Sequence, residues 1–372
     1  MTLEERIRTP GPKKILSLDG GGILGMISVE ILAGIEDMLR KQLQRGADFV
    51  LADYFDLVAG TSTGAIIAAC VAAGMPVARI REFYETSGKD MFDPAFVLKR
   101  LYYKYDDDNL TRKLQSELGK DTKLGDAKLR TLLMMVMRNA TTDSPWPISN
   151  NPYAKYNQRS RADCNLDLPL WQLVRASTAA PTFFPPEVVQ LGGNMFVFVD
   201  GGVTMYNNPA FQAFLMATTE PYQVNWETGE DKLLVVAVGT GVKPNADEGL
   251  RPGQMHMGYE LKTLIPALMY AAKNEQDFLC RTFGRCQSGL PLDREVGDMI
   301  GMAGPARPKL FTYMRYDADV SQAGLDGLGQ TDIREANIQS MDSVAHVDDL
   351  QKLGRAVAVN KVRAEHYAAF LQ

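Results

Sequence analysis

Cysteine, histidine and long apolar runs are all scarce in this 372-residue chain. Its four cysteines are scattered, which excludes a disulfide framework and favours a reducing compartment. The most apolar stretch, residues 65–77, is shorter than the ~20 residues that a bilayer span needs, and no apolar signal core follows the charged N-terminus. We therefore expect a soluble cytoplasmic protein whose contact with the inner face of the membrane is peripheral.

Positive charge is not in excess either. Lys and Arg number 40 against 45 Asp and Glu, so the formal net charge is −5 and no nucleic-acid polymer is expected as a partner. Cys280 and Cys286 have no second pair or nearby His for zinc, and Asp106–Asp108 lack the alternating spacing of a calcium loop. The sequence predicts no metal and no cofactor.

What the chain does have is a globular composition, 45% hydrophobic and 23% charged, with apolar runs that stop at glycine turns. The pattern predicts strands over residues 13–18, 54–59, 129–137, 195–199 and 233–238. Helices are expected over residues 23–43, 168–180 and 347–370, over 75–128 with polar breaks, and after an N-cap at Asn208 followed by Pro209. Residues 141–167, rich in Pro, Asn and Ser, are expected to form a long surface loop.

Strands that alternate with helices indicate an α/β fold with a central, mostly parallel sheet between helices. The chain has no internal repeat and no low-complexity linker. We expect one domain over 1–372, with a core at about 13–242 and a C-terminal helical portion at about 243–372 packed on it. Residues 264–278 carry apolar side chains at helical spacing, which we expect to pack against the sheet, with a lipid access path as the alternative.

Three of the predicted strands end at a glycine-framed polar residue. These turns are Asp19-Gly20-Gly21-Gly22, Gly60-Thr61-Ser62-Thr63-Gly64 and Asp200-Gly201-Gly202. Because ligands of open α/β sheets bind at the carboxyl ends of strands, we expect the three turns to converge on one site.

The second turn has the G-x-S-x-G pattern of a nucleophile elbow between a strand and a helix. Gly60 and Gly64 relieve crowding there, and Ser62 is the candidate nucleophile at a helix N-terminus. A serine needs a base, and the chain offers three histidines, His256, His346 and His366. None of them follows a strand, so Asp200 is the favoured partner in a Ser–Asp dyad, while a Ser–Asp–His triad of the α/β-hydrolase type stays open.

The first turn also fits G-x-G-x-x-G, which leaves open a nucleotide-binding regulatory protein that holds phosphate at the Gly20 turn. That fingerprint requires an acidic residue at the end of the second strand, where this chain has the serine elbow. We therefore favour an oxyanion hole in which the N–H groups of Gly20, Gly21 and Gly22 stabilise a tetrahedral intermediate.

The order of these motifs resembles the patatin-like phospholipases. The matching pieces are Asp19–Gly25, Gly60–Gly64, Ala179–Pro186, Asp200–Gly202 with Asn207–Pro209, and Gly239–Gly241. The resemblance implies a patatin-like three-layer fold and hydrolysis of acyl esters of membrane phospholipids by a Ser62–Asp200 dyad without a metal. Many members have Arg or Lys at the position of Leu24, so a neutral-lipid or general carboxylesterase activity stays open.

The resemblance also bears on control. Some bacterial relatives are anti-phage effectors that cyclic dinucleotides activate, so we expect a closed resting site that a small anionic ligand or self-association opens. Four basic residues are candidates to meet a phosphate, with a solvated helix face as the plainer interpretation for most of them: Lys99, Arg100, Lys104 and Arg281.

Overall fold

A nine-stranded sheet forms the centre of the computed structural model, which describes residues 2–92, 109–181, 184–242, 251, 257–341 and 344–371. The strands are β1 (Lys13–Leu18), β2 (Leu57–Thr61), β3 (Leu132–Asn139), β4 (Ser144–Ser149), β5 (Glu187–Leu191), β6 (Asn194–Asp200), β7 (Leu233–Val238), β8 (Arg285–Ser288) and β9 (Thr312–Tyr316). Their order is β5-β6-β3-β2-β1-β7-β9-β8, with β4 paired to β3 off this path.

The sheet is mostly parallel, as predicted. The pairs β1–β2, β1–β7, β2–β3, β7–β9 and β8–β9 run parallel, whereas β4 and β6 pair antiparallel with β3, and β5 pairs antiparallel with β6. The central strands β1 and β7 are in register from Lys13 opposite Leu233 to Leu18 opposite Val238. Both faces of these strands are covered, which explains their continuous apolar sequences.

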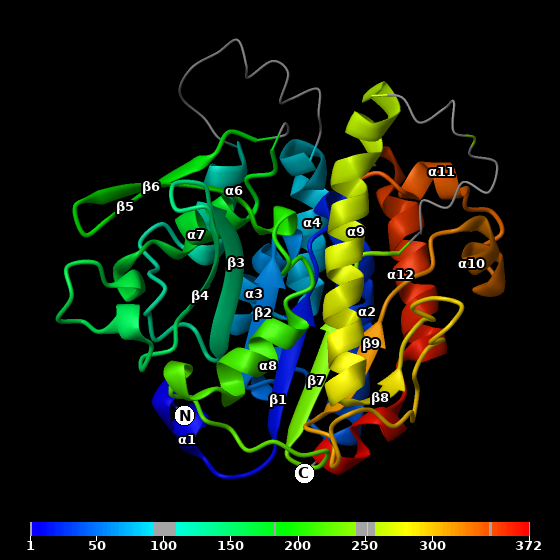
Figure 1. Cartoon of the computed structure of the whole chain (residues 1–372), viewed down its shortest axis with the longest axis horizontal. Helices are drawn as coiled ribbons and strands as arrows, with labels where there is room; N and C mark the ends of the chain where they lie inside the picture. The colour runs from blue at the N-terminus through cyan, green and yellow to red at the C-terminus, as the bar shows by residue number, and fades with distance from the viewer. Residues whose placement is uncertain are drawn as a thin grey trace.

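Helices cover both faces and complete the three layers (Figure 1). One face packs against α2 (Gly25–Gln42), α3 (Thr63–Ala72), α4 (Val77–Phe92), α6 (Asn109–Leu118), α7 (Leu170–Ser177) and α12 (Val347–Lys361). The other packs against α1 (Leu3–Arg8), α8 (Ala210–Thr218) and α9 (Met257–Phe283). Strand side chains alternate between these two cores, for example Leu16 on the first face and Ile15 on the second.

Several sequence predictions need correction. Residues 141–167 are not one loop, because β4 lies within them and pairs with β3. The strand predicted from residue 54 begins at Leu57, and the helix predicted at Asn208 begins at Ala210, whose N–H binds the Asn208 side chain. The helix predicted to reach residue 370 ends at Lys361 and is followed by a 3₁₀ segment, Ala364–Phe370.

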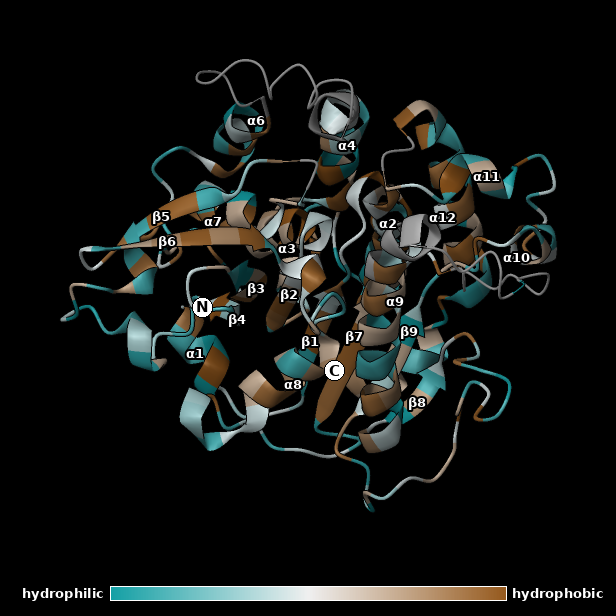
Figure 2. Cartoon of the chain, turned by 45° about the horizontal axis from the view of Figure 1, so that its top comes forward, coloured by the Kyte–Doolittle hydropathy of each residue, from teal (hydrophilic) through white to brown (hydrophobic). Residues whose placement is uncertain are grey.

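The C-terminal portion contributes strands as well as helices. It adds β8 and β9 to the sheet, together with the short helices α10 (Gln322–Gly327) and α11 (Glu335–Ile338). Figure 2 shows the apolar central strands and the more polar outer loops. Among the described helices, none combines the length and the apolar character that crossing a membrane requires.

The apolar stripe of α9 faces outward, contrary to prediction. Leu264 and Leu268 are 55% and 61% exposed, and Ala271 and Phe278 are exposed as well. The buried side of the helix instead carries polar side chains that have partners, and these are Lys273, Asp277 and Arg281. Helical periodicity was therefore predicted correctly and the buried face was not.

Candidate active site

The serine elbow has the strained backbone that the motif predicts. Ser62 has a φ of +55°, a left-handed value that is uncommon outside glycine, between the end of β2 and the start of α3. A Cβ on Gly60 would lie 2.1 Å from the carbonyl oxygen of Gly64, and one on Gly64 would lie 2.2 Å from that of Leu18. Both positions therefore require glycine, and the tight turn presents the Ser62 side chain.

Ser62 and Asp200 are in direct contact. The Ser62 hydroxyl donates a hydrogen bond of 2.6 Å to Asp200 Oδ2, and the backbone N–H of Gly202 donates one of 2.6 Å to Asp200 Oδ1. Burial raises the pKa of Asp200 to about 6, although the two hydrogen bonds act in the opposite direction. A carboxylate with this pKa, bonded to a serine hydroxyl, is suited to accept the serine proton near neutral pH.

Asp200 reaches Ser62 by a different route from the one expected. Asp200 ends strand β6, which runs antiparallel to β3. The rule that site residues gather at the carboxyl ends of parallel strands therefore does not explain its position. β6 pairs with β3 over Met137–Asn139, and Asp200 lies opposite Met137. The strand thus enters from beyond the end of β3, and its last residue stops beside the elbow.

The elbow is held by residues that sequence reasoning missed. The N–H of Ser62 donates to Ser177 Oγ at 3.0 Å, and the Ser177 hydroxyl donates to the carbonyl of Val136 on β3 at 2.5 Å. Thr61 Oγ1 donates to the carbonyl of Tyr206 at 2.6 Å. A serine in the last turn of a helix carries no signal in the sequence that would indicate this role.

The Gly20–Gly22 turn lies beside Ser62. A Cβ on Gly20 would be 3.2 Å from Ser62 Cβ and 2.3 Å from Asn207 Oδ1. The N–H of Gly20 already donates to the carbonyl of Asn207 at 3.1 Å, so the predicted oxyanion role of this amide needs correction. Among the described residues, no backbone acceptor binds the N–H of Gly21 or Gly22, and these two remain the candidate oxyanion donors.

The histidines form other contacts. His366 Nδ1 shares a hydrogen bond of 2.9 Å with the Tyr316 hydroxyl, and His346 Nδ1 lies 3.4 Å from Asp349 in the same segment. His256 lies outside the described residues. Among the described residues, the side chain that accepts from the Ser62 hydroxyl is the carboxylate of Asp200.

The basic residues that were candidates for a ligand phosphate give little support to that role. Arg281 is buried and forms an ion pair with Asp277. It also donates to the carbonyls of Leu290 and Asp298. Its guanidinium is thus neither exposed to solvent nor free to bind a phosphate. Lys99, Arg100 and Lys104 lie outside the described residues, as do Asp106–Asp108. Leu24 packs into the core, so this chain offers no cation at that position.

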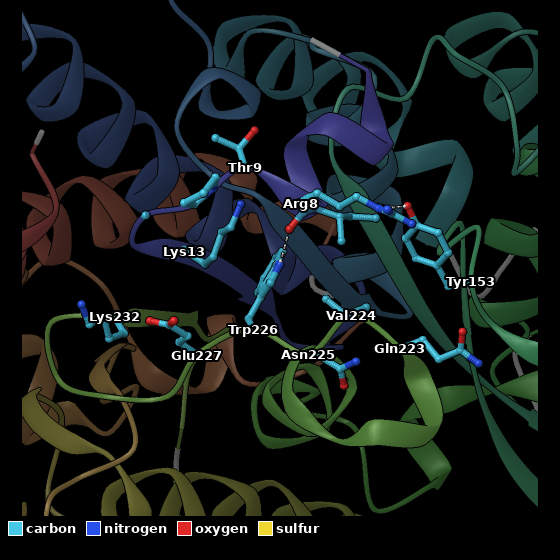
Figure 3. A pocket seen from close by; sticks show the side chains of 13 residues that line it. Arg8, Thr9, Lys13, Tyr153, Gln223, Val224, Asn225, Trp226, Glu227 and Lys232 are labelled. Atoms are coloured by element: carbon cyan, nitrogen blue, oxygen red, sulfur yellow. Dashed lines mark hydrogen bonds between the residues drawn. The ribbon is translucent and has the colours of Figure 1, made fainter.

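A surface pocket lies elsewhere, at the amino ends of β1 and β7 (Figure 3). Its lining includes Lys13, at the start of β1, and Lys232, just before β7. Arg8 Nε donates to the Tyr153 hydroxyl at 2.6 Å, and the Trp226 indole donates to the carbonyl of Ile7 at 3.0 Å. Since β1 and β2 are parallel and Ser62 follows the carboxyl end of β2, this pocket is not part of the Ser62 site.

Comparison with known proteins finds relatives that match part of this chain. The chain is 30% identical over 252 residues to Patatin-17 of Solanum cardiophyllum and 29% identical over 255 residues to Patatin-16 of Solanum tuberosum, which is 63% of this chain in each case. The chain spans 62% of the length of both relatives. VipD of Legionella pneumophila is a similar solved structure, with 13% identity, a TM-score of 0.35, and coverage of 92% of this chain and 67% of that one.

The profile of the patatin-like phospholipases matches residues 16–214, more than half of the 372 residues. The matched region contains the elbow, the Gly20 turn and Asp200. This chain therefore belongs to the patatin-like phospholipase family.

Proposed function

We propose that this protein hydrolyses acyl esters of membrane phospholipids through a Ser62–Asp200 dyad. The observation that carries the proposal is the 2.6 Å hydrogen bond from a serine on a strained elbow to a buried carboxylate. Membership of the patatin-like phospholipase family supports the acyl-lipid substrate. The proposed reaction uses groups of this chain together with one water molecule.

In the acylation step, Ser62 Oγ attacks the ester carbonyl carbon while its proton moves to Asp200 Oδ2. The carbonyl oxygen becomes an oxyanion, which the N–H groups of Gly21 and Gly22 stabilise. Collapse of the intermediate breaks the bond to the alcohol oxygen, which takes the proton from Asp200 and leaves as the lysolipid. Water then attacks the acyl-serine, Asp200 takes the proton of the water, and Ser62 recovers it as the fatty acid leaves.

The surface near the dyad fits a lipid substrate. The terminal methyl of Met269, on α9, lies 3.4 Å from the position of a Gly202 Cβ, next to Asp200. On the same helix Leu264 and Leu268 are exposed, and Val203 and Met205 are exposed just after Gly202. Exposed apolar side chains gathered beside a site are suited to contact acyl chains at a membrane surface.

The test is hydrolysis of phosphatidylcholine vesicles by the purified protein, with fatty acid and lysolipid measured by mass spectrometry. Ser62→Ala should abolish both products and the covalent labelling by a fluorophosphonate, whereas Ser144→Ala on β4 should leave them unchanged. Cleavage of p-nitrophenyl butyrate or triacylglycerol without phospholipid would favour a carboxylesterase or neutral lipase instead. Absence of Ser62 labelling and of all ester cleavage would refute the proposal.

A further inference from the structure

We propose that Thr240 is a positioning residue that orients the Gly20–Gly21 peptide so that the N–H of Gly21 serves the oxyanion hole. The inference rests on the proposed function, because it assigns a support to one of its two oxyanion donors. Thr240 follows β7, is 2% exposed, and its hydroxyl donates to the carbonyl oxygen of Gly20 at 3.0 Å.

The planar peptide bond turns this contact into an orientation. The carbonyl of Gly20 and the N–H of Gly21 belong to one peptide unit and point in opposite directions when it is trans. With the carbonyl bound to Thr240, the N–H of Gly21 points away from Thr240. The turn lies between Thr240 and the elbow, since a Cβ on Gly21 would be 2.3 Å from Thr240 Oγ1 and one on Gly20 would be 3.2 Å from Ser62 Cβ.

Glycine makes such a fixed contact necessary. Without a Cβ, the chain on either side of this peptide tolerates more than one orientation. A reversed Gly20–Gly21 peptide would direct a carbonyl oxygen, not an N–H, toward the oxyanion. The hydrogen bond from Thr240 favours the productive orientation, and the bond from the Gly20 N–H to the Asn207 carbonyl fixes the preceding peptide.

The residue after Thr240 is held by a cluster of buried charges, which we call the Arg315 cluster: Asp19, Lys273, Arg315 and Asp317. Asp317 Oδ1 accepts from the N–H of Gly241 at 2.8 Å, and Lys273 Nζ donates to the carbonyl of Gly241 at 3.1 Å. The residue after Thr240 is thus bound through both of its backbone groups.

The same cluster includes Asp19, the residue before Gly20. Arg315 Nη1 donates to Asp19 Oδ1 at 2.8 Å, and Arg315 Nη2 donates to Asp317 Oδ2 at 2.6 Å. The Arg315 cluster therefore fixes both Asp19 and Gly241. Their chain neighbours Gly20 and Thr240 are the two residues that the hydrogen bond joins. The side chains of Asp19, Arg315 and Asp317 are at most 3% exposed, so solvent does not screen this anchor.

The test compares Thr240→Val, which keeps the shape and removes the donor, with Thr240→Ser, which keeps the donor. Steady-state kinetics on p-nitrophenyl butyrate give kcat and KM. Two inhibitors distinguish stabilisation of the oxyanion from ground-state binding. A trifluoromethyl ketone forms an oxyanion with Ser62, whereas a non-hydrolysable ether analogue binds without forming one. Thr131→Val is the matched control, because Thr131 is a buried threonine before β3 whose hydroxyl donates to the carbonyl of Leu132.

For Thr240→Val we expect kcat to fall by about 10- to 100-fold, below the ~10²–10³ that removal of a whole donor costs, with KM nearly unchanged. The Ki of the trifluoromethyl ketone should rise in proportion, whereas that of the ether analogue should not. Thr240→Ser should recover most of kcat, and Thr131→Val should resemble the wild type.

If the wild type is active, either of two results would overturn the proposal. The first is an unchanged kcat in a folded Thr240→Val variant. The second is a loss of affinity that is equal for both inhibitors, together with a kcat that Thr240→Ser does not recover. An inactive wild type whose Ser62 is not labelled would instead refute the proposed function, and this inference with it. Circular dichroism of each variant verifies that it is folded.

Discussion

Replacing Asp200 by Asn is expected to lower the rate of hydrolysis by orders of magnitude and, at the same time, to stabilise the protein at alkaline pH. Burial raises the pKa of Asp200 from its ordinary 3.8 to about 6 in the folded state. Between these values the folded protein keeps a proton that the unfolded chain has released, so the contribution of Asp200 to the free energy of unfolding falls as the pH rises through this window. Above about pH 6 the loss is complete and amounts to about 3 kcal/mol.

Asn removes this loss because it carries no charge to bury. It can also keep both polar contacts of Asp200: its Oδ1 can accept from the N–H of Gly202, and its Nδ2 can donate to Ser62 Oγ. The variant should therefore be up to about 3 kcal/mol more stable than the wild type at about pH 8, and of nearly equal stability at about pH 4. Without the base, hydrolysis should fall by roughly 10²–10⁴.

The assay is urea unfolding at both pH values, followed by fluorescence of the three tryptophans. Titration of the other acidic groups cancels in the difference between variant and wild type. Ser62→Ala is the control, because it removes the nucleophile but leaves the carboxylate. It should lose stability with rising pH at least as much as the wild type, because the hydrogen bond that it removes lowers the pKa of Asp200. A difference in stability between Asp200→Asn and wild type that is the same at both pH values would refute the reasoning.

Three further predictions follow from the same structure. The kcat/KM for a soluble ester should rise with pH through about 6 and then level off, because Asp200 must be ionised to accept the serine proton; activity that peaks below this pH would contradict it. Arg315→Met should lower the free energy of unfolding by about 3–5 kcal/mol in urea, because it leaves two buried carboxylates without their main partner, and a change under about 1 kcal/mol would show that the cluster does not stabilise the fold. Joint replacement of the three histidines, His256, His346 and His366, should leave most ester hydrolysis intact. Loss of hydrolysis in a folded triple variant would instead favour a Ser–Asp–His triad.

The strands and turns that were predicted correctly are those whose environment is uniform. β1 and β7 are buried on both faces, so each is a continuous apolar run with a polar or glycine stop, and both were predicted at their observed bounds. β4 was missed because Pro145 and Pro147 argue against a strand. Proline is tolerated there because β4 lies off the main path of the sheet, where a missing N–H breaks no central pairing.

The parts that could not be predicted depend on partners distant in the sequence. β9 contains Arg315, which a local pattern assigns to solvent, yet its partner Asp19 is 296 positions away along the chain. The outward-facing stripe of α9 has the same origin. Its polar side is buried because Lys273 and Arg281 find carboxylates there, and Asp277 also accepts from the Tyr313 hydroxyl.

The glycines explain why the sequence motifs located the site, whereas the side chains that hold its turns in place were not predicted. A Cβ on Gly60 would meet the backbone of Gly64, one on Gly201 would lie 2.2 Å from the carbonyl oxygen of Val136, and one on Gly239 would lie 1.9 Å from Asp317 Oδ2. Each of these glycines marks a place where another segment comes too close for any side chain. A serine that needs a carboxylate on one side and backbone donors on the other requires several such approaches, and each one fixes a glycine in the sequence. The side chains that hold those segments in place obey no comparable restriction, so Ser177, Thr240 and Arg315 become visible only in the folded structure.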